Sequence, residues 1–276
     1  MLNVLSTQLY RLKKSKLFWA LFIVCAVLPF LGALFISGVT SILENNLSGE
    51  NADLFAELMG KGGERTLSAI SSLTSLSSDA ALFSLICSSI FLSGEFSGGA
   101  IRNMVLANKS RTQIFLSFLS VALVIGFSYL GVSYVSTLLF YGAFIGFGGV
   151  TVSAAISSCF TSLFLGVLSI ALVQSLVCLF VFSTRKTGPT VAFPILFILF
   201  VPSIITFIAE LILQMKLFAG QTVSEASLSW VPLCNMTLFD ANNVDGALVG
   251  KIALYNIPIT VLFATLSWVA SKKDMK

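Results

Sequence analysis

The stretch that decides the fold is residues 112–184, TQIFLSFLSVALVIGFSYLGVSYVSTLLFYGAFIGFGGVTVSAAISSCFTSLFLGVLSIALVQSLVCLFVFST. It contains no Asp, Glu, Lys or Arg over about 73 residues, too many for one spanning helix of ~20 residues and enough for two. Its flanks are basic, Arg111 before it and Arg185 with Lys186 after it, and basic flanks favour the cytoplasm. We therefore expect two membrane crossings here, joined outside by the glycine-rich segment 142–149.

Composition extends this prediction to the whole chain. The sequence is 57% hydrophobic and only 10% charged, whereas soluble domains average about 25% charged residues. Hydropathy predicts six spans at about 17–39, 76–93, 113–141, 154–183, 191–213 and 252–270, with outer loops at about 40–75 and 214–250. The expected fold is a single all-α integral membrane domain over residues 1–276.

The positive charges predict the orientation of this domain. Six spans place twelve of the 16 basic residues on one side: Arg11, Lys13, Lys14, Lys16, Arg102, Lys109, Arg111, Arg185, Lys186, Lys272, Lys273 and Lys276. The opposite side receives the other four basic residues and most of the acidic ones. Because Lys and Arg concentrate in cytoplasmic segments, we predict a multi-pass protein of the cell membrane with both termini in the cytoplasm.

Several functional classes are excluded by the residues present. The chain has no histidine, which removes metalloproteases with an HExxH helix and histidine proton relays, and no metal site is expected. The basic residues border apolar runs and form no polar face for nucleic acid. The one glycine-lysine cluster, GKGGERT at residues 60–66, does not match GxxxxGK[ST] and falls in an outer loop, so no ATP site is expected.

Small residues recur within the predicted spans, for example Gly126 and Gly131 in the third. Small side chains let helix backbones approach closely in a membrane. These glycines therefore predict close packing, either within the bundle or across a dimer.

Residues 1–16 predict an amphipathic helix. Its leucines recur at helical spacing, with basic and amide side chains elsewhere on the wheel: Leu2, Leu5, Leu9 and Leu12 against Gln8, Arg11, Lys13 and Lys14. Basic amphipathic helices lie in the headgroup plane of the membrane. Two interpretations stay open, a simple membrane anchor and a surface helix on which a cytoplasmic partner rests.

The inner loop between the second and third spans, SGEFSGGAIRNMVLANKSR at residues 93–111, is chemically the most distinctive segment. Glu95 is the only acid predicted on the cytoplasmic side before Asp274. Gly98 and Gly99 permit a tight bend, and residues 100–107 predict a short helix. Taken alone, the loop also fits a charged turn that obeys the positive-inside rule.

This loop resembles the one found in ABC-2 type transporter permeases. Those proteins show an acid, an aromatic residue, a small-residue turn, a short helix with Ile and a basic residue, and Ser-Arg before the third span. The N-terminal helix and the six-span layout are also similar, which implies a type V exporter-like transmembrane domain. The motif covers about twenty residues, and the sequence departs from it at Asn108 and Lys109, where many members have a Pro.

The resemblance implies a coupling role for the loop. It would seat in a separate ABC ATPase subunit through Glu95, Phe96, Gly98, Gly99, Ile101, Arg102 and Arg111, with residues 1–16 as a connecting helix beside it. ATP and Mg would be bound in that partner and no cofactor in this chain, which is expected to be a transport subunit and not an enzyme. A second copy or a homologous permease and membrane lipid would be its other partners.

The expected function is therefore that of a permease subunit that exports an amphipathic substrate such as a peptide, antibiotic or lipid, because the spans offer few charges to an ionic solute. The alternative is a membrane-embedded scaffold or immunity protein that binds a partner without transport. Copurification of an ATP-binding protein distinguishes the two.

Overall fold

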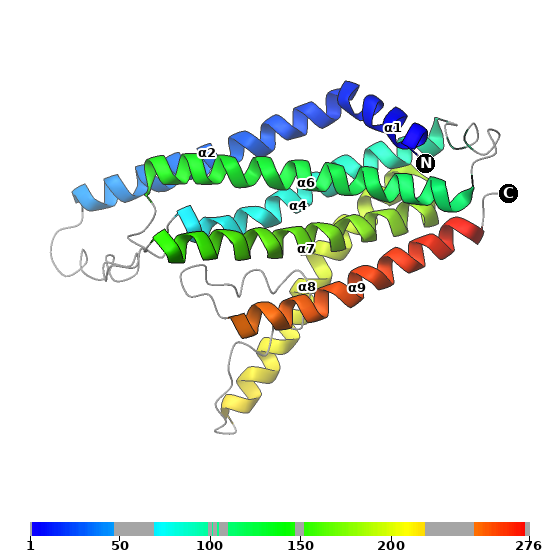
Figure 1. The fold of residues 1–276 in the computed structure, drawn as a ribbon. Helices are drawn as coiled ribbons and strands as arrows, with labels where there is room; N and C mark the ends of the chain where they lie inside the picture. The colour runs from blue at the N-terminus through cyan, green and yellow to red at the C-terminus, as the bar shows by residue number, and fades with distance from the viewer. Residues whose placement is uncertain are drawn as a thin grey trace.

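The computed structural model describes residues 2–46, 69–98, 101, 104, 110–146, 152–218 and 246–273. Over these residues all regular structure is helical, as predicted (Figure 1). The helices are α1 Leu2–Lys14, α2 Lys16–Asn46, α4 Ala69–Ser97, α6 Arg111–Phe144, α7 Val152–Thr184, α8 Thr187–Phe218 and α9 Gly246–Lys273.

Five of these helices contain a stretch long and apolar enough to cross a membrane. The stretches are Lys16–Gly38, Asp79–Phe96, Arg111–Phe144, Ala155–Thr184 and Val249–Lys272. In α8 the apolar stretch Thr187–Phe200 is shorter than a span, although the helix itself continues to Phe218. A multi-pass membrane fold is thus confirmed, and the crossing by α8 stays a prediction.

The helices are longer than the predicted spans and extend into the segments predicted as outer loops. α2 continues to Asn46 and α4 begins at Ala69, while α8 reaches Phe218 and α9 begins at Gly246. A helix satisfies its own backbone hydrogen bonds and so continues past the apolar run, whereas hydropathy marks only the part suited to hydrocarbon.

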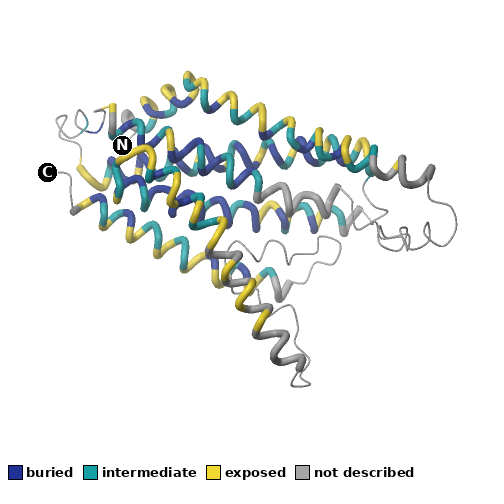
Figure 2. Tube along the Cα trace, turned by 180° about the vertical axis from the view of Figure 1, so that it is seen from behind, coloured by how far each residue is buried: buried dark blue, intermediate teal, exposed yellow. Residues whose placement is uncertain are grey.

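The core lies in α4, α6 and α7, and the other helices cover it (Figure 2). Among the candidate spans, 56–67% of the residues are buried in these three helices, against 17% in α2 and α9. The outer helices present large apolar side chains outward, such as Phe35, Phe207 and Leu254. Such exposure is stable where the surrounding solvent is hydrocarbon.

The central helices approach closely at a glycine, with a polar contact beside it. A Cβ added at Gly126 of α6 would lie 2.4 Å from Cγ2 of Ile170 in α7. Beside it, Gln174 of α7 donates from Nε2 to the hydroxyl of Ser84 in α4 at 3.0 Å. The prediction of close packing is confirmed at Gly126, whereas a Cβ at Gly131 would meet nothing within 4 Å.

The connection after α6 begins at a glycine as well. Gly146 has φ +92°, and its N–H bonds the carbonyl of Tyr141 at 3.0 Å. A left-handed residue that closes the last turn of a helix is a common C-terminal cap, and glycine adopts it without strain. This glycine therefore ends α6 within the segment that the sequence predicts as a turn.

Candidate functional site

Both described ends of the chain lie at the same end of the helix bundle (Figure 1). We call this end the terminal face and define it as α1, the last turn of α4, the first turn of α6 and the last turn of α9. Three of the residues that the sequence analysis assigns to coupling, Glu95, Phe96 and Arg111, lie here beside the basic residues of α1.

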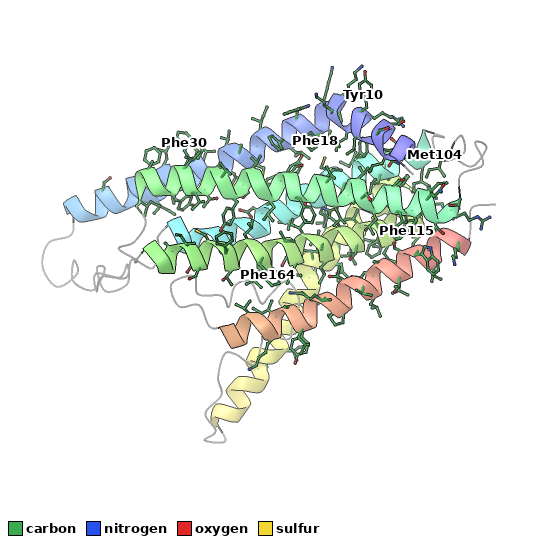
Figure 3. All side chains as sticks on the ribbon, in the orientation of Figure 1. Tyr10, Phe18, Phe30, Met104, Phe115 and Phe164 are labelled. Carbon is green, nitrogen blue, oxygen red and sulfur yellow. The ribbon has the colours of Figure 1, made fainter. Side chains whose placement is uncertain are left out.

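α1 lies on the bundle through its leucines. Leu12 is buried, and Leu5 and Leu9 pack against the core. Arg11, Lys13 and Lys14 are exposed, so the amphipathic character of the segment is present in the folded chain. Figure 3 shows Tyr10 on the outer side of α1.

Gln8 differs from its predicted place on the polar face of α1, because it is fully buried. Successive residues of an α-helix are rotated by about 100°, so Gln8 lies within about 60° of both Leu5 and Leu12. It therefore flanks the apolar stripe and enters the interface with it. Neither amide atom of Gln8 has a hydrogen-bond partner among the described residues.

Arg11 and Glu95 join α1 to the end of α4. Nη1 of Arg11 donates to Oε2 of Glu95 at 2.6 Å, across 84 residues of sequence. The Glu95 side chain is 3% exposed and that of Arg11 is 49% exposed. A buried carboxylate is costly without a partner, so this ion pair is what makes α1 and the end of α4 depend on each other.

Phe96 and Ile101 of the inner loop are also turned inward. The ring of Phe96 packs edge-on against Phe118 of α6 and Phe182 of α7, with centroids 5.7 Å and 5.5 Å apart. Ile101 is 9% exposed and belongs to the same core. These apolar positions therefore anchor the loop to the bundle.

The Ser-Arg pair before the third span has a defined local role. Ser110 is the N-cap of α6, and its hydroxyl accepts from the N–H of Gln113 at 3.3 Å. Arg111 donates from Nη1 to the carbonyl of Lys272 at 2.6 Å. A guanidinium there satisfies one of the carbonyls left free at the end of α9, so the pair joins the start of α6 to the end of α9.

The other predicted coupling residues are less constrained or not described. Gly98 is exposed, and its N–H bonds the carbonyl of Gly94 at 2.8 Å. Gly99 and Arg102 lie outside the described residues, as does most of the predicted short helix, of which Ile101 and Met104 are helical. Contact of this loop with an ATPase subunit stays a prediction.

Sequence reasoning missed two aromatic side chains, one that joins α2 to α1 and one that joins α2 to α6. The indole of Trp19 donates to the carbonyl of Lys13 at 2.8 Å, at the end of α1. The hydroxyl of Tyr129 in α6 donates to the carbonyl of Phe18 at 2.9 Å and is buried. The sequence did hold a signal for Tyr129, whose phenol lies within a charge-free run. A buried hydroxyl needs a hydrogen-bond partner, so this side chain could have been expected to bond another helix.

The terminal face is therefore a set of joined elements. The ion pair links α1 to α4, Tyr129 links the start of α2 to α6, and Arg111 links α6 to α9. These contacts connect α1 and the end of α4 to the spanning helices.

Comparison with known proteins identifies one family. The profile described as "ABC-2 family transporter protein" matches residues 4–203, from α1 into α8. Searches of curated proteins and of solved structures gave no match. The match confirms the resemblance found in the inner loop and covers well over half of the chain.

Proposed function

Because the chain belongs to the ABC-2 transporter family, whose permeases are membrane transport components that associate with an ATPase subunit, we propose that it exports an amphipathic substrate. Two permeases, identical or homologous, pair with two ATPase subunits that bind the ATP and Mg. The cytoplasm then faces the terminal face, and both termini lie on that side.

One observation carries the coupling part of the proposal, the Arg11–Glu95 ion pair at the terminal face. It joins the N-terminal helix to the segment that leads into the predicted coupling helix. When the ATPase subunits close, movement of that segment pulls on α1 and α4 together, which favours one of two arrangements of the spans. Glu95 acts in this proposal through Arg11 and is a positioning residue.

The substrate class follows from the polarity of the spans. Buried polar groups of the described core are mostly hydroxyls and amides, such as Ser84, Ser89 and Gln174, and Glu95 is the one buried carboxylate of that set. Such groups orient a neutral polar moiety but do not neutralise a strongly ionic one. A peptide, antibiotic or lipid with an apolar body fits this interior.

The coupling role is tested in the purified complex of the chain with its ATPase. We expect Glu95→Ala and Arg102→Ala each to lower the substrate-stimulated ATPase rate several-fold, because the movement is no longer transmitted. Lys251→Ala, at the other end of α9, is the control and should keep the wild-type rate. ATPase rates unchanged by both inner-loop substitutions would overturn the coupling role.

Folding is separated from coupling by Glu95→Gln, which retains the size of the side chain and an acceptor for Arg11. A wild-type melting temperature for Glu95→Gln with a reduced stimulated rate supports transmission through the ion pair. If no ATP-binding protein copurifies with the intact chain, the scaffold interpretation replaces this one. Direction is measured as ATP-dependent uptake of a fluorescent amphipathic peptide into inside-out vesicles, which an importer would not show.

A further inference from the structure

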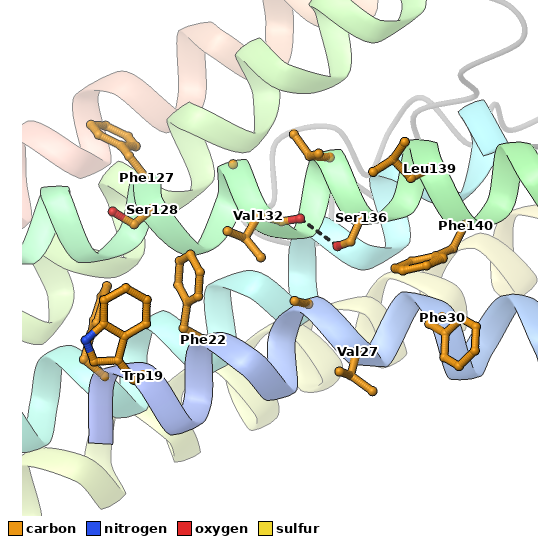
Figure 4. A pocket seen from close by; sticks show the side chains of 14 residues that line it. Trp19, Phe22, Val27, Phe30, Phe127, Ser128, Val132, Ser136, Leu139 and Phe140 are labelled. Atoms are coloured by element: carbon orange, nitrogen blue, oxygen red, sulfur yellow. Dashed lines mark hydrogen bonds between the residues drawn. The ribbon is translucent and has the colours of Figure 1, made fainter. Parts of the chain in front are cut away.

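An apolar groove of about 1020 Å³ runs between α2 and α6 on the outside of the bundle (Figure 4). Phe22 and Phe30 of α2 and Phe127, Leu139 and Phe140 of α6 are among the side chains that line it. Gly131 also lines the groove, and a Cβ added there would meet nothing within 4 Å. This space is therefore open to whatever surrounds the spanning helices.

The chemistry of the groove selects a hydrocarbon chain. Its two hydroxyls are already bonded within α6, Ser128 to the carbonyl of Val124 at 2.7 Å and Ser136 to that of Val132 at 2.6 Å. Neither hydroxyl needs a ligand to satisfy it. An occupant is thus held by apolar and aromatic contact alone.

The length of the groove is close to the thickness of one leaflet. From Trp19 to Phe30 the wall formed by α2 rises about 16 Å at ~1.5 Å per residue, roughly half of the ~30 Å hydrocarbon core. The groove starts beside Trp19, whose indole bonds the end of α1, and amphipathic aromatic rings of this kind sit at the membrane interface. The groove is therefore long enough along α2 to hold one acyl chain.

Positive charge lies at the same end of the groove. Lys13 and Lys16 are exposed at the junction of α1 and α2. Lys16 lies three residues before Trp19, and the backbone carbonyl of Lys13 accepts from the Trp19 indole. A phosphate held there would lie at the headgroup level, directly above the start of the groove. Basic residues near a membrane surface favour anionic lipids.

We propose that the junction of α1 and α2 and the α2–α6 groove form a binding site for one anionic glycerophospholipid. Its phosphate lies by Lys13 and Lys16, and one acyl chain follows the groove. The lipid fills the space between α2 and α6. The site requires only the membrane fold, so it stands whether or not the chain exports a substrate.

The test uses the full chain in lipid nanodiscs of phosphatidylcholine. Trace phosphatidylglycerol with a photoreactive group in one acyl chain is compared with phosphatidylcholine that carries the same chain. We expect the phosphatidylglycerol probe to label α2 and α6 peptides several-fold more than the phosphatidylcholine probe. Equal labelling by both probes, or labelling spread equally over α9, would overturn the proposal.

Matched variants separate the two parts of the site. Gly131→Leu fills the groove and should remove most of the labelling, whereas Gly38→Leu, elsewhere on the bundle surface, should retain it. The double variant K13Q/K16Q should lose the preference for phosphatidylglycerol while the phosphatidylcholine signal persists, and Lys251→Gln should change neither. If Val27→Cys chains form an intermolecular disulfide through the groove, a second copy occupies it and the lipid site is rejected.

Discussion

Single residues decide how closely the central helices pack. Gly126 lies where α6 meets α7, with Ile170 and Gln174 directly opposite. The amide of Gln174 then reaches Ser84 on α4, so one small residue allows three helices to meet. In a membrane, where lipid is as apolar as the helices, such close contact and interhelical hydrogen bonds provide much of the association energy.

At this scale we predict that Gly126→Ala destabilises the chain by about 1–2 kcal/mol, because overpacking a tight contact costs about 1–3 kcal/mol. The measurement is the melting temperature in detergent. Gly250→Ala on α9 is the control. A Cβ added at Gly250 meets nothing within 4 Å, and both variants gain the same helix propensity from the change of glycine to alanine. Equal melting temperatures for the two variants would contradict the contact.

At the scale of elements, the helix ends at the terminal face hold one another. Ser15 directly precedes α2, and its hydroxyl accepts from the N–H of Phe18 at 3.4 Å; Ser110 precedes α6, and its hydroxyl accepts from the N–H of Gln113. The end of α9 is covered by Arg111 and by Lys272, whose Nζ lies 3.4 Å from the centroid of the Trp268 ring. Of these contacts, the one from Arg111 joins two helices, and the others are local to a single helix end.

We expect Ser110→Ala to lower the free energy of unfolding by about 1 kcal/mol, the usual cost of losing an N-cap. Ser120→Ala is the matched control, because the hydroxyl of Ser120 donates to a carbonyl inside the helix and does not cap a backbone N–H at its start. Thermal unfolding of both variants compares them directly. A control variant as destabilised as Ser110→Ala would show that the cap has no special role.

At the scale of the whole molecule, helix order and the shared location of the described chain ends favour an even number of crossings. The described ends of α1 and α9 lie together (Figure 1). Five helices satisfy the length and hydropathy of a span, and α8 supplies the sixth crossing in our proposed topology.

This topology predicts the result of reporter fusions. Reporters at both termini and after Lys186 should be active only on the cytoplasmic side, and one inserted within residues 219–245 only on the opposite side. Enzymatic reporters specific to each compartment measure this in cells. A reporter at 219–245 on the same side as the one after Lys186 would remove the crossing by α8.

Much of this architecture follows from composition and order alone. Hydropathy predicted the helices, because apolar length acts locally and needs no knowledge of neighbours. Their direction across the membrane, taken from the basic flanks, stays a prediction. The inner loop at residues 93–111 likewise identified the family before any helix was placed. Even so, the interpretation of that loop as a contact surface left out that Glu95 and Ile101 are buried and that Phe96 packs, half-buried, against the core.

Which partner each side chain meets was decided only by packing. Gly126 and Gly131 look alike in the sequence, yet one touches α7 and the other borders an open groove. Arg111 and the carbonyl of Lys272 are 161 residues apart, and Arg11 and Glu95 are 84 apart. Such contacts depend on the rotation and crossing of helices, which small shifts of packing determine and which local periodicity does not contain.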